Sequence, residues 1–258
     1  MAKGILRLNG CMSFIKGLFT KKIRIRINDL RETQKLFKHK SGIEIGGPSK
    51  FFDNKGLVPL YRIIKKLDGC NFSTNTIWEG KIESGKGYKY YKYKKGIQYI
   101  SEASDLNLIQ DSKYDFVLSC NCLEHLANPL KAIQEWLRVI KPGGLLLLVL
   151  PNKEYCFDHN RPVTEFSHLL IDFHNEVEEN DLTHLNDILL LHDLEMDKLA
   201  GTFEQFKARS LNNYDNRALH QHVFSLSLLI EVLHYFRMEV IQTYEGQNFV
   251  ITGKKIKG

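Results

Sequence analysis

The chain has 258 residues, a length that suits one large domain or one domain with a sizeable insertion. Apolar residues make up 43% and charged residues 26%, which excludes disorder, collagen and coiled coil as descriptions of the whole chain. The longest apolar run, Leu145 to Leu150, is far shorter than the roughly 18 residues of a membrane-spanning helix. Five cysteines without paired C-x-x-C motifs argue against a disulfide scaffold or a zinc ribbon and favour a reduced, cytoplasmic compartment.

The net charge of +6 is spread unevenly along the chain. Lys and Arg are concentrated in residues 1–40 and 81–95, whereas residues 162–197 carry ten acidic residues and neither Lys nor Arg. A uniformly basic surface for nucleic acid is therefore excluded as a description of the protein. We treat residues 1–40 as a basic N-terminal extension that is either simply solvated or contacts a partner or the inner face of the membrane.

Strand and helix patterns alternate through the first half of the chain. Residues 41–48 predict a short buried strand that ends in a glycine turn, and a helical stretch is expected around Leu57–Lys66. A weak strand near Leu67–Phe72 follows, and residues 81–95 are expected to be an exposed loop. Gln98–Ala103 is the next predicted strand.

The second half continues the alternation up to a long insertion. Tyr114–Cys120 predicts a strand, Asn128 and Pro129 begin a helix, and Leu145–Leu150 predicts a central strand that is buried on both faces. A last helix precedes a hairpin whose turn is Glu245 to Asn248. The pattern predicts an α/β fold with a mostly parallel sheet, and a helical insertion or lid at about 152–222 within a domain of residues 41–258.

The turn Glu44-Ile45-Gly46-Gly47-Pro48 faces the ligand crevice of such a fold. Pro48 stands where the dinucleotide fingerprint needs its second glycine, which disfavours a nicotinamide oxidoreductase. Alone, the turn is as consistent with a tight structural turn as with a ligand site.

Two longer motifs resemble a known family. Residues 114–126, which contain Leu123-Glu124-His125, and residues 136–144, which end in Lys141-Pro142-Gly143-Gly144, closely resemble the class I S-adenosylmethionine-dependent methyltransferases. The resemblance covers about residues 40–152 with the terminal helix and hairpin. It implies a Rossmann-like, mostly parallel, seven-stranded sheet and methyl transfer from S-adenosyl-L-methionine.

The same resemblance implies which residues bind the cofactor. Glu44, Gly46 and Gly47 would form the first cofactor motif. Asp68 would bind the ribose hydroxyls, although it is equally consistent with a turn residue before Gly69. The adenine would meet Glu102 and the backbone of Ala103, and Asn121 would lie near the transferable methyl group.

Candidate catalytic and acceptor residues follow the fourth and fifth strands. His125, His159 and His222 are the candidates for a general base, and spacing alone does not choose among them. Lys153, Asp158 and Arg161 are candidates for binding the acceptor substrate, with a local pair of Asp158 and Arg161 as the alternative interpretation.

No histidine spacing matches a recognised ligand set, so no metal is expected. Residues 150–164 and the His-rich insertion resemble a methyltransferase branch associated with bacterial surface-polysaccharide biosynthesis. The resemblance implies a small-molecule or glycan acceptor: a sugar, a sugar nucleotide or a capsule precursor methylated on oxygen. N-methylation of a small amine and a non-catalytic cofactor-binding subunit of glycan assembly are the alternatives.

Overall fold

A computed structural model describes Leu30 and residues 32–256, apart from the side chain of Lys86. The remainder of the basic extension, with Cys11, lies outside the described residues, and so does the expected membrane or partner contact of that segment. Among the described residues, no helix is both long and apolar enough to cross a bilayer.

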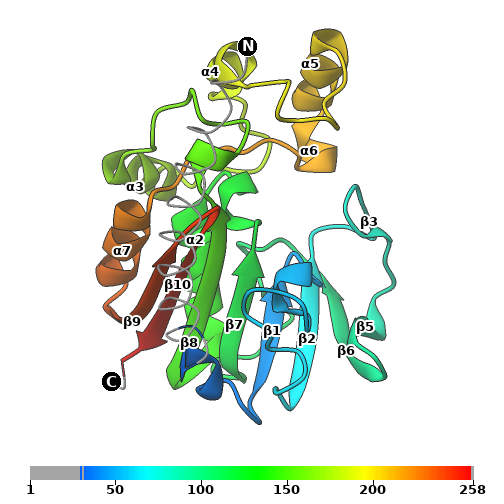
Figure 1. Cartoon of the computed structure of the whole chain (residues 1–258), viewed down its shortest axis with the longest axis vertical. Coiled ribbons are helices and arrows are strands. Elements are labelled where there is room, and N and C mark those ends of the chain that lie inside the picture. The colour runs from blue at the N-terminus through cyan, green and yellow to red at the C-terminus, as the bar shows by residue number, and fades with distance from the viewer. Residues whose placement is uncertain (1–29, 31, 257–258) are drawn as a thin grey trace, which may run out of the picture.

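The core is one eight-stranded sheet with the order β5-β6-β2-β1-β7-β8-β10-β9 (Figure 1). Its strands are β1 (Ser41–Ile45), β2 (Lys66–Asn71), β5 (Gly85–Tyr91), β6 (Lys94–Ile100), β7 (Tyr114–Cys120), β8 (Ile140–Pro151), β9 (Met238–Glu245) and β10 (Asn248–Lys255). Strands β6, β2, β1, β7 and β8 are parallel neighbours, whereas β10 is antiparallel to both β8 and β9. The predicted mostly parallel sheet with a C-terminal hairpin is confirmed.

The sheet has one strand more than the seven predicted, because residues 81–95 are not an exposed loop. Strand β5 pairs antiparallel with β6 at the edge of the sheet, with irregular register. Tyr88 and Tyr90 are buried while Lys89 between them is exposed. This period-two alternation stabilises a strand within an otherwise polar stretch. A small separate hairpin of β3 (Asn75–Thr76) and β4 (Gly80–Lys81) precedes it.

The helix expected around Leu57–Lys66 is absent. Between β1 and β2 the structure has only the 3-10 helix η1 (Lys50–Phe52) and turns. Pro59 has no N–H to donate within a helix. Lys94 Nζ donates hydrogen bonds of 2.8–3.2 Å to the carbonyl oxygens of Tyr61, Arg62 and Ile64, so these carbonyls are satisfied without a helix. Apolar residues of this segment still pack on the sheet, so it covers the face without helical periodicity.

The two faces of the sheet are covered differently. Helices α2 (Pro129–Val139), α3 (Phe166–His174) and α7 (Leu226–Tyr235) contribute apolar residues to one core cluster. The other face is covered by residues 51–64 and by Leu30 and Phe37, which are both buried. Because these two side chains belong to the segment treated as an N-terminal extension, the packed domain begins before residue 41.

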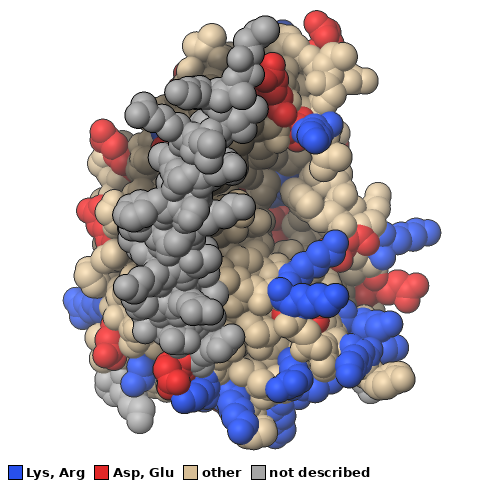
Figure 2. Space-filling model, in the orientation of Figure 1, with Lys and Arg blue, Asp and Glu red and all other residues tan. Residues whose placement is uncertain are grey.

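The region after β8 is helical, as expected. It contains η3 (Lys153–Tyr155), α3, α4 (Leu185–Leu191), α5 (Phe203–Leu211) and α6 (Asn213–Asn216). Helices α4, α5 and α6 lie above the carboxyl ends of the parallel strands (Figure 1). Figure 2 shows Lys and Arg gathered toward the opposite, lower end of the visible face.

Candidate active site

A pocket of about 490 Å³ lies at the carboxyl ends of β1, β2, β7 and β8. Gly46, Asn71, Asn121 and Pro151 line it from the strand ends, and residues 197–220 of the insertion contribute further walls. This position is the ligand crevice of an open α/β sheet, and the volume suits a small molecule.

The first turn brings the backbone of Gly46 to the pocket. Gly46 has φ +77°, and a Cβ atom there would come within 3.0 Å of the Cβ and Sγ atoms of Cys122. Glycine is therefore required both by the left-handed backbone and by the space. Gly47 does not line this pocket; a Cβ atom there would lie 2.3 Å from Cδ of Glu44.

Glu44 supports the turn from behind and does not line the pocket. Its buried carboxylate accepts hydrogen bonds from the hydroxyls of Tyr88 and Tyr61, at 2.6 and 2.8 Å, and from the backbone N–H of Ser49 at 2.9 Å. Burial raises the pKa of Glu44 to about 7 despite these bonds. The predicted cofactor contact of Glu44 is thus replaced by a positioning role.

Asp68 is not at the pocket, contrary to prediction. It lies within β2, where its buried carboxylate accepts from the Ile97 N–H at 2.8 Å and the Tyr114 hydroxyl at 2.9 Å. Asn71 is the residue at the end of β2 that lines the pocket, and its Nδ2 donates to the Gly47 carbonyl at 3.1 Å. Asn71 therefore takes the place that the sequence interpretation gave to Asp68.

Glu102 and Ala103, which the family resemblance assigns to the adenine, both line the pocket. Arg217 donates to both carboxylate oxygens of Glu102, at 2.8 and 3.3 Å, and pairs with Glu179 at 2.8 Å. Its guanidinium also lies 5.0 Å from the centroid of the Phe72 ring. Sequence reasoning missed Arg217, because it comes from the insertion, far along the chain from the strand ends that it contacts.

Asn121 and Glu124 line the pocket after β7. Asn121 has a φ of +47° and donates its backbone N–H to the carbonyl of Val149 at 2.9 Å. Glu124 is 1% exposed, and neither of its carboxylate oxygens has a hydrogen-bond partner among the described residues. Burial raises the pKa of Glu124 to about 7. An unpartnered buried carboxyl group in a pocket is costly, which points to a ligand that completes it.

Two histidine rings stand beside Glu124. His125 and His220 both line the pocket, with ring centroids 4.6 Å apart, and the ring of Trp78 lies 5.2 Å from that of His125. Burial, together with His220, lowers the pKa of His125 to about 3, so this ring is neutral. Its Nδ1 lies 3.0 Å from the carbonyl oxygen of Leu219.

His220 is oriented by a buried carboxylate. Its Nδ1 is hydrogen-bonded to Oδ2 of Asp158. Burial alone would lower the pKa of His220, but the bond and the charge of Asp158 outweigh that effect and raise it. The pKa of Asp158 falls to about 2, because bonds and charges from His220 and Arg161 overcome its burial. The arrangement is a histidine held in one tautomer by an ionised partner.

The predicted acceptor-binding residues hold the loop together instead of lining the pocket. Arg161 is 5% exposed and donates to Asp158 at 2.9 Å and to the carbonyls of His220 and Gln221 at 2.7 and 3.1 Å. Lys153 Nζ donates to the carbonyl of Arg161. The local pairing of Asp158 and Arg161, the alternative interpretation, is what the structure contains.

The other two predicted bases also lie away from the pocket. His159 Nε2 contacts Asp193 Oδ2 at 2.8 Å near the surface. His222 is buried, with Nε2 at 3.0 Å from Asp172 and Nδ1 at 3.1 Å from the Leu126 carbonyl. Of the candidate bases, only His125 reaches the pocket, and His220 joins it.

Comparison with known proteins gives one family match: residues 60–148 match a model described as a methyltransferase domain. Among curated proteins no match was found. A SAM-dependent methyltransferase from Methanosarcina mazei is 18% identical over 86% of this chain and 94% of that one, with a TM-score of 0.47. A SAM-dependent methyltransferase from Thermotoga maritima, described as a possible histamine N-methyltransferase, is 17% identical over 94% and 96%, with a TM-score of 0.43.

The matched segment contains β2, β6 and β7 and most of β8, whose carboxyl ends border the pocket. The strand order is that of a Rossmann-like sheet, and residues 60–148 within it match a methyltransferase domain. The chain therefore contains a methyltransferase domain, and S-adenosylmethionine is the cofactor that its sequence motifs imply.

Features of the pocket fit this cofactor. Its walls include apolar side chains such as Ile45, Phe72 and Ala103. Gly46 leaves its backbone accessible where a Cβ atom would intrude. The amide oxygen of Asn71 can accept a hydrogen bond from a ribose hydroxyl.

Proposed function

We propose that the enzyme transfers a methyl group to a hydroxyl of a sugar, a sugar nucleotide or a related glycan precursor. The observation that carries the proposal is the Asp158–His220 pair, which presents an oriented imidazole to the pocket. A hydroxyl must lose its proton as it attacks carbon, and a positioned histidine is the side chain most often used for that task.

We assign the cofactor to the strand-end side of the pocket. The Gly46 backbone would hold its amino-acid part, Asn71 the ribose, and Glu102 with Ala103 the adenine. Bound there, S-adenosylmethionine supplies an electrophilic methyl group on a positively charged sulfur. The chain's part is to align the acceptor with that methyl group and to keep water away.

His220 would take the acceptor proton. With Nδ1–H donated to Asp158, the unprotonated Nε2 of the neutral ring is the basic atom. Asp158 is fixed in turn by Arg161, which also donates to the His220 carbonyl. Arg161 and Asp158 thereby act as positioning residues. The neutral His125 packs edge-on against His220 and fixes the plane of its ring.

A second candidate is methylation of a small amine. The unpartnered carboxyl group of Glu124 favours it, because an ionised carboxylate in the pocket would attract a cationic amine. An amine needs only a free lone pair to attack, so a general base would contribute less to its reaction.

The test is a methyl-transfer assay with sugar nucleotides, phosphorylated sugars and small amines, on the wild-type enzyme and the His220→Gln variant. For a hydroxyl acceptor we expect His220→Gln to lower kcat by about 100-fold or more, while S-adenosylhomocysteine affinity stays within about 2-fold. His174→Gln, which replaces an exposed histidine at the end of α3, is the matched control. Turnover with amines only, or unchanged kcat in His220→Gln, would overturn the proposal.

A further inference from the structure

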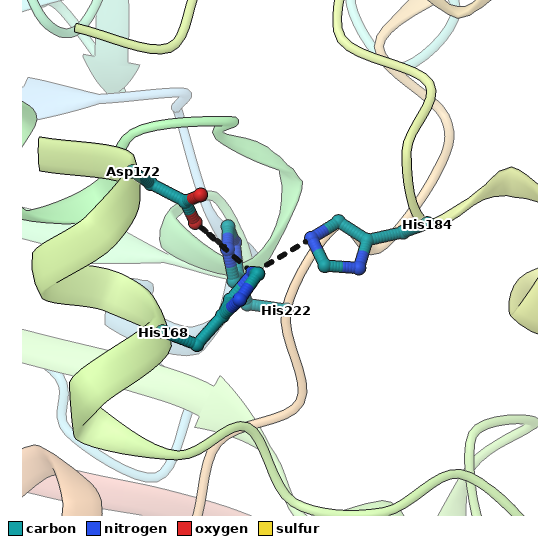
Figure 3. A group of neighbouring side chains, drawn as sticks. All are labelled: His168, Asp172, His184 and His222. Carbon is teal, nitrogen blue, oxygen red and sulfur yellow. Dashed lines mark hydrogen bonds and ion pairs between the residues drawn. The ribbon is translucent and has the colours of Figure 1, made fainter. Parts of the chain in front are cut away.

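Three histidines and one aspartate converge within the insertion, away from the pocket. We call His168, Asp172, His184 and His222 the histidine cluster (Figure 3). His168 and Asp172 are one turn apart on α3, His184 directly precedes α4, and His222 lies shortly before α7. One ligand atom from each residue lies within 4.8 Å of those of all the others.

Within the cluster, ring nitrogens and a carboxylate oxygen lie within hydrogen-bond distance of one another, although few of these atoms carry a hydrogen. Nε2 of His168 lies 3.0 Å from Nε2 of His184 and 3.2 Å from Oδ2 of Asp172, and Nε2 of His222 lies 3.0 Å from that same oxygen. Nε2 of His168 therefore has one nitrogen and one carboxylate oxygen within 3.2 Å, and a single N–H can serve only one of these contacts well.

The contacts of His222 contain the same conflict. Its Nδ1 lies 3.1 Å from the carbonyl oxygen of Leu126 and its Nε2 lies 3.0 Å from Oδ2 of Asp172, so the single N–H of a neutral ring can serve only one of two acceptors. Binding a metal through Nε2 would leave the hydrogen on Nδ1, donated to Leu126. The lone pair of Nε2 then points at the carboxylate of Asp172. A positive charge between the two groups removes the repulsion. A histidine whose second nitrogen donates to a backbone carbonyl is also the usual arrangement of a metal ligand.

We propose that the histidine cluster binds a zinc ion through Nε2 of His168, His184 and His222 and through the carboxylate of Asp172. Zinc prefers four ligands of the imidazole and carboxylate type in a tetrahedron. Bond lengths of about 2.0–2.1 Å place tetrahedral ligand atoms about 3.3–3.5 Å apart. Three of the six separations between ligand atoms are 3.0–3.2 Å and need to open by a few tenths of an ångström, and the other three lie within 4.8 Å.

Four protein ligands leave no open position, so the ion has a structural role. It joins α3, the turn before α4 and the segment before α7. Two further contacts fix the site to the sheet end: Leu126 accepts from His222, and Asn128 Nδ2 donates to the Asp172 carbonyl at 2.9 Å. His222 is two residues from His220, so the ion fastens the segment that presents the proposed base to the pocket.

The test is the metal content of the full-length purified protein, measured by mass spectrometry after dialysis. We expect about one zinc ion per chain in the wild type and in the control His174→Gln, and at least a 10-fold lower content in Asp172→Asn and His184→Gln. Metal content does not depend on methyl transfer, so its outcome is separate from that of the proposed function. A wild-type chain without zinc, or variants that retain it, would overturn the proposal.

A second measurement covers variants that fail to fold. Wild-type protein stripped by a chelator is titrated with zinc and then with Co²⁺, whose visible spectrum reports tetrahedral coordination. We expect stoichiometric binding, a tetrahedral Co²⁺ spectrum and a rise in Tm on adding zinc. Absence of saturable binding by the folded, stripped chain would mean that the cluster is held by shared protons, and the zinc site would be rejected.

Discussion

The unpartnered, buried Glu124 lowers the stability of this enzyme as the pH rises, and a substitution that removes its carboxyl group removes that contribution. Its side chain is buried, and burial raises its pKa from an ordinary 4.5 to about 7. An unfolded chain therefore ionises Glu124 near pH 4.5, whereas the folded chain does so only near pH 7. In this window the unfolded state binds fewer protons, so the free energy of unfolding falls as the pH rises.

The magnitude follows from the two pKa values. The separation between 4.5 and about 7 corresponds to about 3 kcal/mol once both states are ionised. At pH 5.5 the penalty is about 1 kcal/mol, and at pH 8.5 the full value applies. Glu124→Gln keeps the shape of the side chain, removes the charge and breaks no hydrogen bond of either carboxylate oxygen to the described residues.

We therefore expect the free energy of unfolding of Glu124→Gln, relative to that of the wild type, to be about 2 kcal/mol higher at pH 8.5 than at pH 5.5. Urea denaturation of both proteins at the two pH values, without ligand, measures this double difference. Glu231→Gln, at an exposed position on α7, is the matched control and should show a pH-independent effect within about 0.5 kcal/mol. If the advantage of Glu124→Gln is the same at both pH values, the carboxyl group does not carry this burial penalty.

Three further predictions concern the cofactor and the loop. Gly46→Val should weaken S-adenosylhomocysteine binding at least about 10-fold in calorimetry, because its Cβ would meet Cys122 and its φ is positive. Normal affinity in a folded variant would show that the cofactor does not bind beside Gly46. Asn71→Ala should weaken the same binding about 10-fold while Asp68→Asn leaves it unchanged, and the reverse order would restore Asp68 as the ribose ligand. Arg161→Ala should lower the free energy of unfolding by about 3–5 kcal/mol in urea, because the buried Asp158 loses its Arg partner and two buried carbonyls lose their donor. A loss under 1 kcal/mol would contradict that.

Local patterns in the amino-acid sequence predict most of the strands of the sheet. Residues 145–150 are apolar throughout, as a strand buried on both faces requires, and Tyr114–Cys120 has the predicted bounds. The edge strand β5 is not predicted, because lysines and glycines make up much of this segment and are typical of a loop. Only the alternation of Tyr88 and Tyr90 with exposed neighbours indicates a strand there.

The site is harder to predict, because its polar groups come together through tertiary packing. Glu102, Ala103, Asn121 and His125 belong to motifs within the α/β core, and all four line the pocket. Residues of the insertion have no fixed distance in sequence from the strand ends, so spacing cannot separate His220, which faces the pocket, from His222, which faces away. The same property hides the histidine cluster, whose ligands come from three separate segments.

The lysine-bearing edge of the sheet bears on the solubility of the protein. Strand β5 is the outermost strand beside β6, so it has a row of backbone groups on which another chain could add a strand. Its irregular pairing with β6 distorts that row, and exposed Lys89 and Lys92 would have to lose water and approach like charges in a second copy. The lysines that make this segment resemble a loop in the sequence therefore protect the sheet against edge-to-edge aggregation. Replacing Lys89 and Lys92 with valine would remove that protection and would change no residue of the pocket.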